Sequence, residues 1–203
     1  IVILGAGESG VGAAILSQCK GYPVFVSDAG AIADHYRVTL DQYGIEYEEL
    51  GHTKDRILQA DIVIKSPGIP DTIDLIRALK YQETTIIDEL EWAARFTKAK
   101  LIAVTGSNGK TTTAKLIHHL LDTAGFDVGL AGNIGYSFAK QVALSDKAYY
   151  VLEVSSFQLD YLQELSFDIA VLLNITPDHL DRYQNKMELY TRSKFKIIQK
   201  KTP

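Results

Sequence analysis

The chain has 203 residues, of which 46% are hydrophobic and 23% charged, the balance of an ordinary globular protein. Its net charge of −4 gives no electrostatic reason to bind nucleic acid, and no apolar run approaches the length of a membrane span. Cys19 is the only cysteine, so an intrachain disulfide is excluded and a cytoplasmic location is expected.

The first half of the chain alternates short apolar strands with helices. We predict strands over residues 1–4, 24–27, 45–48, 61–66 and 84–87, and helices over 12–20, 32–43, 55–60 and 71–80. Strands that are apolar throughout and alternate with helices are typical of a parallel sheet buried on both faces, with right-handed crossovers. The pattern therefore predicts a Rossmann-like α/β fold for this half.

A glycine-rich loop, Gly5-Ala-Gly-Glu-Ser-Gly10, follows the first strand and precedes a helix. Its spacing fits the dinucleotide fingerprint, and Asp28 ends the second strand, where an acid could bind a ribose hydroxyl. The run Ser66-Pro-Gly68 follows a later strand, at the sheet edge where ligands bind, although an ordinary turn has the same pattern. Alone, the loop supports a nicotinamide or flavin site, but it can seat any diphosphate.

The second half begins the same alternation again. We predict strands over 101–104, 148–154 and 169–175, and helices over 89–96, 112–124, 156–164 and 187–199. We place the domain boundary at Ile87/Asp88, which gives domains 1–87 and 88–203. The second domain has fewer strands than a nucleotide-hydrolase domain usually needs, so we expect it to be incomplete and the chain to be part of a longer protein.

The most informative motif is Thr105-Gly-Ser-Asn-Gly-Lys-Thr-Thr112, between a strand and a helix. Small residues let backbone N–H groups face an anion, the helix N-terminus adds positive potential, and Lys110 can reach the terminal phosphates of a nucleotide. Thr111 lies where a hydroxyl would coordinate the Mg²⁺ of that nucleotide. Val104 replaces the first glycine of the common pattern, and a structural turn is the alternative. The order of the parts predicts a P-loop-type α/β domain that binds a nucleoside triphosphate.

Further polar residues lie where predicted strands end. Glu153 could hold Mg²⁺ or cap the helix after it. Asn133 and His179 lie in polar loops that could be sites or turns, and Lys194 on the last helix could be a solvated charge. The residues alone leave these alternatives open.

Together, six segments of the chain resemble the Mur ligases of bacterial cell-wall synthesis. They are Gly5–Gly10, Ser66–Ile69, Thr105–Thr111, Ala131–Gly135, Leu152–Leu159 and Asn174–Tyr183. Their order and spacing cover essentially the whole chain. Within the family, Glu-Val-Ser-Ser-Phe-Gln at 153–158 is most similar to the member that adds D-glutamate.

The resemblance implies a role for each matching position. ATP would be held by Gly106, Ser107, Asn108, Gly109, Lys110, Thr111 and Thr112. The UDP-substrate, in place of a nicotinamide, would be held by Glu8, Ser9, Asp28, Ala29, Ser66, Pro67, Gly68, Asn133 and His179. Mg²⁺ or Mn²⁺ would be held by Thr111, Glu153, His179 and, if CO₂ carbamylates it, Lys194. The catalytic residues would be Lys110, Glu153, His179 and Lys194. Ala29 lacks the side-chain hydrogen-bonding group that some relatives have near this point.

The implied reaction is ATP-dependent amide-bond formation in peptidoglycan synthesis. ATP would phosphorylate the carboxylate of UDP-N-acetylmuramoyl-L-alanine, and the amine of D-glutamate would attack the acyl phosphate, giving ADP and phosphate. The family has a third, C-terminal domain that this chain lacks, so we expect the 203 residues alone to be inactive as a ligase. A monomer without a nucleic acid or membrane partner is expected.

Three other functions stay open from the sequence. A nicotinamide-dependent oxidoreductase would use Gly5–Gly10 but leave Lys110 and Glu153 unexplained. A P-loop regulatory module would leave the first glycine loop unexplained. A Mur ligase that adds a different amino acid would share all the motifs except those around Phe157 and Gln158.

Overall fold

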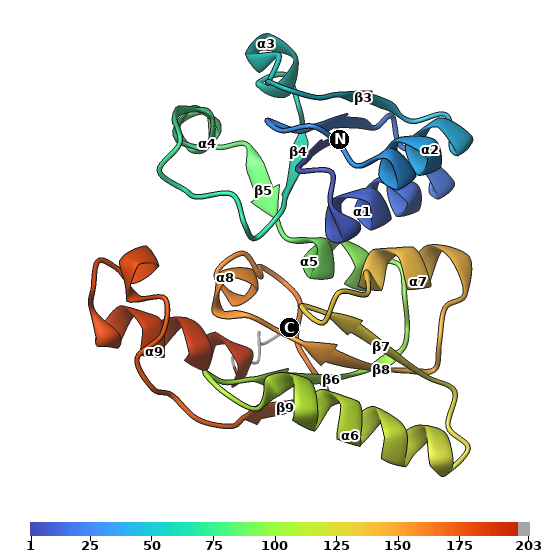
Figure 1. Cartoon of the computed structure of the whole chain (residues 1–203), viewed down its shortest axis with the longest axis vertical. Coiled ribbons are helices and arrows are strands. Elements are labelled where there is room, and N and C mark those ends of the chain that lie inside the picture. Colours follow the sequence, from blue (N-terminus) through green and yellow to red (C-terminus); the bar gives the residue numbers. More distant parts are fainter. Residues whose placement is uncertain (199–203) are drawn as a thin grey trace.

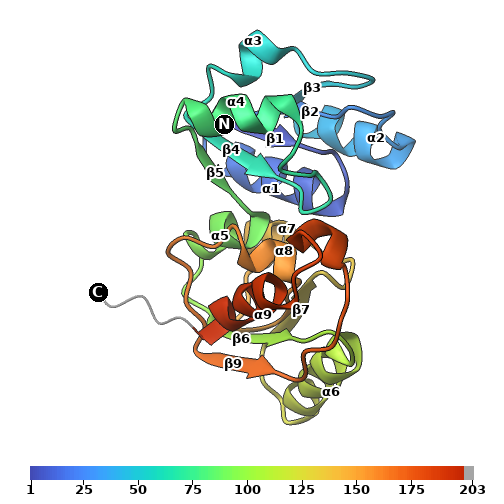
Figure 2. The ribbon, with the colours of Figure 1, turned by 90° about the vertical axis from the view of Figure 1, so that its left-hand side faces the viewer.

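The computed structural model describes residues 1–198. The chain forms two sheets, one of five strands and one of four, and every strand pair between neighbours is parallel. Figure 1 shows the first sheet and its helices in the upper part of the molecule and the second in the lower part. The turned view in Figure 2 shows the same two stacked parts. The predicted α/β fold class is confirmed.

The first unit is built around a sheet of order β3-β2-β1-β4-β5. Its strands are β1 (Val2–Leu4), β2 (Phe25–Ser27), β3 (Glu46–Glu48), β4 (Ile62–Lys65) and β5 (Thr85–Ile87). Its helices are α1 (Glu8–Cys19), α2 (Asp34–Gln42), α3 (Lys54–Ile57) and α4 (Asp74–Tyr81). Because β1 lies between β2 and β4, the loop after β1 leaves the sheet where the strand order reverses.

The second unit is built around a sheet of order β7-β8-β6-β9. Its strands are β6 (Lys100–Thr105), β7 (Val128–Gly132), β8 (Tyr149–Glu153) and β9 (Ile169–Leu172). Its helices are α6 (Lys110–Thr123), α7 (Phe138–Leu144), α8 (Ser156–Leu159), the 3₁₀ turn η1 (Leu180–Tyr183), α9 (Met187–Phe195) and the 3₁₀ turn η2 (Lys196–Ile198). Helix α5 (Glu89–Ala94) links the two units.

Alternation along the strands divides the core into three parts. In β1, Ile3 faces one cluster while Val2 and Leu4 face another, as the period of two in a strand requires. The cluster around Ile3 continues through α1, α5 and α7 to the inner face of the second sheet. The outer face of the first sheet packs on α3 and α4, and that of the second packs on α6. Helices α1, α5 and α7 therefore form a shared layer between the sheets (Figure 1).

A close approach of backbone and side chain fixes the contact between α1 and α7. A Cβ added to Gly12 would lie 1.8 Å from the Ser137 hydroxyl oxygen, so only glycine fits on α1 here. The Ser137 hydroxyl also donates to Glu89 Oε1 at 2.6 Å, which ties α5 to the same point. Packing and hydrogen bonds thus join the units through three helices.

Several element boundaries differ from those predicted. Helices α1 and α6 begin at Glu8 and Lys110, one turn or less before the predicted starts, because each glycine loop leads directly into its helix. Helix α8 ends at Leu159 and β9 ends at Leu172, earlier than predicted. Strand β7 and helix α7 were not predicted. The predicted last helix is divided into α9 and η2, and its final residue, Gln199, lies outside the described residues.

Within residues 1–198, no helix combines the length and the apolar character that crossing a membrane would require.

Candidate functional site

The two glycine loops lie at equivalent places in the two sheets. The loop after β1 leaves between β2 and β4, and the loop after β6 leaves between β8 and β9. In open α/β sheets ligands bind at the carboxyl ends of the strands, at such reversal points. Both loops therefore stand where a ligand site is expected.

The loop after β6 has the backbone form of a phosphate cradle. Gly106 and Gly109 take φ values of 156° and 83°, which side chains disfavour, and α6 begins at the next residue, Lys110. Helix α6 has 14 residues, so its N-terminus carries the partial positive charge that attracts phosphate.

Asn174, just beyond β9, fixes this loop from the neighbouring strand. Its Oδ1 accepts a hydrogen bond from the backbone N–H of Asn108 at 2.9 Å, and its Nδ2 donates to the Asn108 carbonyl at 3.0 Å. Its own carbonyl accepts from the Ser107 N–H at 3.0 Å. Three hydrogen bonds from one residue therefore set the shape of the loop.

Lys110 lies folded over the loop that precedes it. Its Nζ donates to the carbonyl oxygens of Gly106 and Ser107 at 2.8 and 2.9 Å. The ammonium group is thus held against the backbone of the loop.

Glu153, at the end of β8, connects the cradle to the loop after β7. The carboxylate is buried and accepts from the Thr111 hydroxyl at 2.7 Å and from the Asn133 amide at 3.0 Å. The Asn133 N–H also donates to the Glu153 carbonyl at 2.8 Å. A Cβ on Gly132 would lie 2.2 Å from that carbonyl oxygen, so the approach of the two strand ends requires glycine. Thr111, Glu153 and Asn133, all predicted site residues, therefore form one hydrogen-bonded group.

Lys194, on α9, contacts the loop after β6. It is 2% exposed, and its Nζ donates to the Gly106 carbonyl at 2.9 Å and to the Thr105 hydroxyl at 3.2 Å. Burial, followed by the positive charge of Lys110, lowers the pKa of Lys194 to about 8. The lysine is therefore a buried part of the site and not a solvated surface charge.

Tyr190, one turn before Lys194, holds the loop in a second way. Its hydroxyl is hydrogen-bonded to the Ser107 hydroxyl at 2.9 Å, and Ser107 Oγ also donates to the Thr176 carbonyl at 2.8 Å. Helix α9 thus supports the cradle with a tyrosine and a lysine.

His179 stands at the start of η1. It has a left-handed backbone, with φ at 48°, and its ring packs against Phe157 with 5.4 Å between centroids. Asp178 Oδ1 lies 3.6 Å from its Nε2. Of the four predicted metal ligands, Thr111 and Glu153 are joined by a hydrogen bond, and within residues 1–198 no hydrogen bond joins His179 to the other three.

The part of the chain that the structure describes contains no group of three or more His, Cys, Asp and Glu side chains arranged for a metal ion. The predicted set has only two residues of those types, and its other donors are a threonine hydroxyl and a lysine. Thr111 and Glu153 supply the hard oxygen atoms that Mg²⁺ prefers, so these two fit such an ion.

In the first unit, Asp28 shapes the glycine loop. Its Oδ2 accepts from the Ala6 N–H at 2.6 Å and its Oδ1 from the Gly30 N–H at 2.8 Å. A Cβ on Gly10 would lie 1.9 Å from the Gly5 carbonyl oxygen, so the loop closes tightly on the start of α1. The predicted ribose-binding acid thus also holds the loop backbone.

The other predicted residues of this site lie around the same edge. Gly5 packs against Ser66, whose Oγ would be 2.6 Å from an added Cβ, which places the turn of Ser66, Pro67 and Gly68 beside the loop. Ala29 follows Asp28 and is exposed, and Ser9 is half-buried at the start of α1.

Glu8 points toward the second unit. Its Oε1 accepts from the Ser137 N–H at 3.2 Å, and its Oε2 accepts from the Tyr36 hydroxyl at 3.4 Å. This predicted UDP-site residue therefore also bridges the two units.

Sequence reasoning included Asn174 and Thr176 in the segment Asn174–Tyr183 but gave neither a role in supporting the second loop. It missed Tyr190 at the same loop, and Glu89 and Ser137 between the units.

The fold and the two loops define an α/β protein with two glycine-rich loops, each at the reversal point of its own parallel sheet. The family model of the MurD N-terminal domain matches residues 1–74, and that of the Mur ligase middle domain matches residues 104–203. The chain belongs to the Mur ligase family.

The sequence is similar to proteins named UDP-N-acetylmuramoylalanine–D-glutamate ligase. It is 57% identical over 202 residues to the protein of that name from Bacteroides fragilis, covering 100% of this chain and 46% of that protein. It is 55% identical over 203 residues to the one from Porphyromonas gingivalis, covering 100% of this chain and 45% of that protein. The chain thus spans about half the length of these relatives.

Solved structures show the same fold. The UDP-N-acetylmuramate:L-alanyl-γ-D-glutamyl-meso-diaminopimelate ligase from Neisseria meningitides aligns with a TM-score of 0.65 at 18% identity, over 97% of this chain and 66% of that one. The UDP-N-acetylmuramate–alanine ligase from Thermotoga maritima aligns with a TM-score of 0.58 at 23% identity, over 97% of this chain and 46% of that one.

Proposed function

We propose that this chain is the UDP-substrate-binding and ATP-binding part of an ATP-dependent ligase that joins D-glutamate to UDP-N-acetylmuramoyl-L-alanine. The observation that carries the proposal is the Thr111–Glu153–Asn133 group beside the Lys110 cradle. It links the loop that we assign to ATP to the amide of Asn133, which we assign to the UDP-substrate. The 57% identity to a protein named as the D-glutamate ligase supports the choice of amino acid.

The two units would divide the work. We propose a boundary at Ile87/Asp88, supported by the fact that β1–β5 make one sheet and β6–β9 the other. In the first unit, the backbone N–H groups at the start of α1 would bind the diphosphate, and Asp28 and the turn of Ser66, Pro67 and Gly68 would bound the uridine. Asn133 and His179 would hold the muramoyl-alanine end of the substrate.

In the second unit, the residues from Gly106 to Thr112 would hold the phosphates of ATP. Lys110 would turn from the loop carbonyls to neutralise charge on the β- and γ-phosphates, and this charge neutralisation is the main contribution a protein makes to phosphoryl transfer. The alanine carboxylate would take the γ-phosphoryl group, and the D-glutamate amine would then displace phosphate from the acyl phosphate.

Thr111 and Glu153 would hold a Mg²⁺ or Mn²⁺ ion, with His179 and a carbamylated Lys194 as further candidates. A carbamate would convert the Lys194 amine into an oxygen donor, which suits a hard cation. Such an ion supplies charge stabilisation for the transferred phosphoryl group. The role in peptidoglycan synthesis and cell division, a cytoplasmic location and a monomeric state belong to the same proposal.

Replacing Lys110 tests the assignment of two sites. Calorimetry on Lys110→Ala should show ATP binding weakened roughly tenfold or more, because a charged hydrogen-bonding partner of the phosphates is lost. The affinity for UDP-N-acetylmuramoyl-L-alanine should stay within about twofold of wild type. Lys115→Ala, an exposed lysine on the same helix, is the matched control. Equal loss of both ligands in Lys110→Ala would contradict the two-site assignment.

The ligase reaction itself is tested by release of ADP with and without D-glutamate. We expect the 203-residue chain to bind both nucleotides but to show little D-glutamate-dependent turnover, because it spans about half the length of the relatives named for this activity. Robust turnover by the 203 residues would contradict this expectation. A set of amino acids offered to the full-length protein tests the specificity.

A further inference from the structure

The turn that follows β4 is held from three sides by side chains. It contains Ser66, Pro67 and Gly68 and leads through Ile69 and Pro70 to Asp71, outside any helix or strand. Lys65, from its own unit, lies beneath it, and Tyr161 and Arg182, from the second unit, lie against it. The contacts of Tyr161 and Arg182 join the turn to the second unit, and we call them the two bridges.

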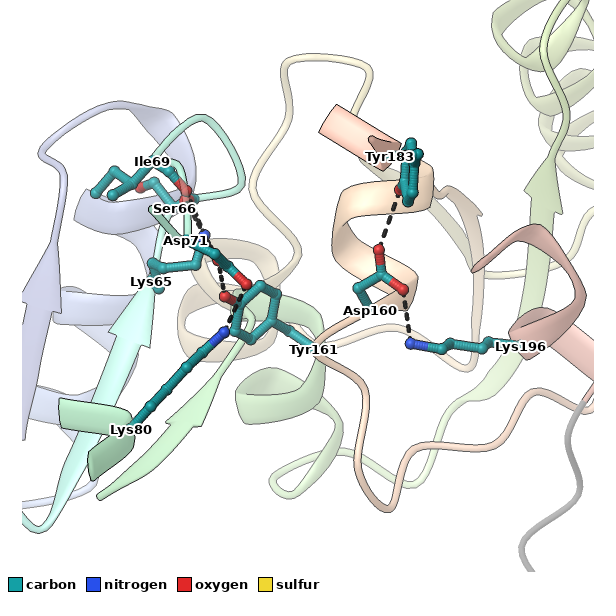
Figure 3. Close-up of polar contacts among 9 residues, drawn as sticks. All are labelled: Lys65, Ser66, Ile69, Asp71, Lys80, Asp160, Tyr161, Tyr183 and Lys196. Atoms are coloured by element: carbon teal, nitrogen blue, oxygen red, sulfur yellow. Dashed lines mark hydrogen bonds and ion pairs between the residues drawn. The ribbon is translucent and has the colours of Figure 1, made fainter. Parts of the chain in front are cut away.

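Lys65 holds the turn from the inside. The side chain is 3% exposed, and its Nζ donates to the Ile69 carbonyl at 2.6 Å and to the Ser66 carbonyl at 3.4 Å. Figure 3 shows the Lys65 amine pointing at these two residues from below the turn. These two hydrogen bonds close the turn on itself.

Tyr161 connects the turn to the second unit. Its hydroxyl donates to Asp71 Oδ1, and Lys80 donates to Asp71 Oδ2 at 2.6 Å. The Lys65 ammonium lies 4.4 Å from the centroid of the Tyr161 ring, a favourable position for a cation on an aromatic face. Figure 3 shows the ring placed among Lys65, Asp71 and Lys80.

The pKa of both partners agrees with this arrangement. Burial and then the hydrogen bond to Asp71 raise the pKa of Tyr161. Although burial opposes it, hydrogen bonds from Lys80 and Tyr161 keep the pKa of Asp71 below its usual value. The pair is therefore a neutral phenol donating to a carboxylate across the neutral pH range.

Arg182 makes the second bridge. One guanidinium nitrogen donates to the Gly68 carbonyl at 3.0 Å, and the guanidinium carbon lies 4.5 Å from the Phe157 ring centroid. Arg182 belongs to η1, three residues after His179, and Phe157 belongs to α8, four residues after Glu153. Arg182 therefore connects the turn to η1, the short helix after His179. Its contact with Phe157 adds α8, the short helix after Glu153.

A cleft of about 370 Å³ lies between the two bridges. Its walls include Pro67, Asp71, Phe157, Tyr161 and Arg182, so both units contribute. The turn is therefore not packed continuously against the second unit, and the two bridges are its discrete points of attachment there.

We propose that Tyr161 and Arg182 are positioning residues that fix the turn of Ser66, Pro67 and Gly68 against the second unit and so set the geometry of the UDP-substrate site. The proposal rests on the proposed function, which assigns this turn to the uridine-diphosphate site. Neither residue touches the substrate in this view. Each acts through the backbone of the turn.

The test compares Tyr161→Phe and Arg182→Gln with two controls on the exposed surface of α4. Tyr81→Phe removes a hydroxyl from a tyrosine that is 91% exposed, and Arg77→Gln removes a guanidinium that is paired locally with Asp74 at 3.6 Å. Tyr161→Phe keeps the ring on Lys65, so it should fold as wild type does. Thermal unfolding of each variant checks the fold.

Two measurements decide the matter. Hydrogen exchange of the backbone amides of residues 66–72 should become faster in Tyr161→Phe and Arg182→Gln and stay unchanged in the controls. Calorimetry should show the affinity for UDP-N-acetylmuramoyl-L-alanine falling about fivefold in each variant, the usual effect of losing one such hydrogen bond, while ADP affinity is unchanged. An Asp71→Asn/Tyr161→Phe double variant should lose less than the sum of the two single variants, because both substitutions remove the same hydrogen bond between Tyr161 and Asp71.

Two results would overturn the proposal. Unchanged exchange in both variants would mean that the bridges do not order the turn, and faster exchange with unchanged substrate affinity would mean that the turn does not position the substrate. If the wild-type chain does not bind the UDP-substrate at all, the proposed function falls and takes this proposal with it. That outcome is distinguished by the wild-type titration alone.

Discussion

Glu89, the first residue of α5, gives the sharpest test of the packing between the units. Its side chain is buried, Oε1 accepts from the Ser137 hydroxyl at 2.6 Å and from the Ala139 N–H at 2.8 Å, and Oε2 has no hydrogen-bond partner among the described residues. Burial, chiefly, and the nearby carboxyl groups of Asp88 and Glu8 raise the pKa of Glu89 to about 8. We therefore predict that Glu89 carries a proton at pH 7.

The sign of the effect on stability follows from proton linkage. The pKa is about 8 in the folded chain against an ordinary value of 4.5, so between these values the folded state holds a proton that the unfolded state has released. The contribution of Glu89 to stability is therefore fully present below its unfolded pKa and is lost as the pH rises through the folded value. At 1.36 kcal/mol per pKa unit, the whole loss is at most about 5 kcal/mol, and about 2 kcal/mol of it falls between pH 6 and pH 8.

Glu89→Gln isolates this term because glutamine keeps the accepting oxygen but cannot ionise. Urea unfolding can be followed by the fluorescence of Trp92, the only tryptophan, which is 2% exposed on the same helix. The variant should gain about 2 kcal/mol relative to wild type when the pH is raised from 6 to 8.

Wild type and Glu89→Gln should both show a further dependence of stability on pH, because burial raises the pKa of Asp88 to about 7. Glu188→Gln, at an exposed glutamate on α9, is the control and should show a constant difference from wild type. A difference between Glu89→Gln and wild type that does not change with pH would show that Glu89 is ionised throughout and would refute the reasoning.

Two further predictions concern the contacts of the units and the cradle. Gly12→Ala should destabilise the chain by about 1–3 kcal/mol, because the added Cβ would lie 1.8 Å from the Ser137 hydroxyl oxygen. Gly7→Ala, where nothing lies within 4 Å of the new atom, should lower the denaturation midpoint far less. Thr111→Val should raise the Mg²⁺ concentration needed for ATP binding while leaving the unfolding free energy within about 1 kcal/mol, since only its hydrogen bond to Glu153 is lost. Calorimetry at several Mg²⁺ concentrations checks this, and an unchanged requirement for Mg²⁺ would remove Thr111 from the proposed ligand set.

Four strands of the first unit, β1, β2, β4 and β5, could be predicted because each is short, mostly apolar and bounded by glycine, proline or polar residues. Strand β3 has the sequence Glu-Tyr-Glu and was predicted from its position after Gly44. Strand β7 could not be predicted, because its sequence is Val-Gly-Leu-Ala-Gly, and two glycines in five residues lower strand propensity. The structure explains both glycines: Gly129 would collide with the Tyr150 ring and Gly132 with the Glu153 carbonyl if either had a side chain. Here tertiary contact overrides local preference.

The candidate site was predictable where a residue follows a strand and has chemistry of its own. Lys110, Thr111 and Glu153 carry that signal, and the structure places them together. The supporting residues have no local signal, because Tyr190 and Ser137 acquire their roles only when α9 and α7 pack onto distant loops. His179 also follows a predicted strand and has chemistry of its own, and its place at the start of η1, with its ring on Phe157, could not be read from the sequence.

The pairing of β6 has a consequence for the order in which the chain can fold. β1 finds all its strand partners within the first 65 residues, because it pairs with β2 and β4. β6 must wait for β8 and β9, which end at Glu153 and Leu172. During synthesis from the N-terminus, the first sheet can therefore close while the strand that carries the phosphate-cradle loop still has no partner. Both edges of β6 stay unpaired until β8 is complete at Glu153, and one edge stays unpaired until β9 is complete at Leu172. That interval is when a nascent chain is most exposed to aggregation and most dependent on chaperones.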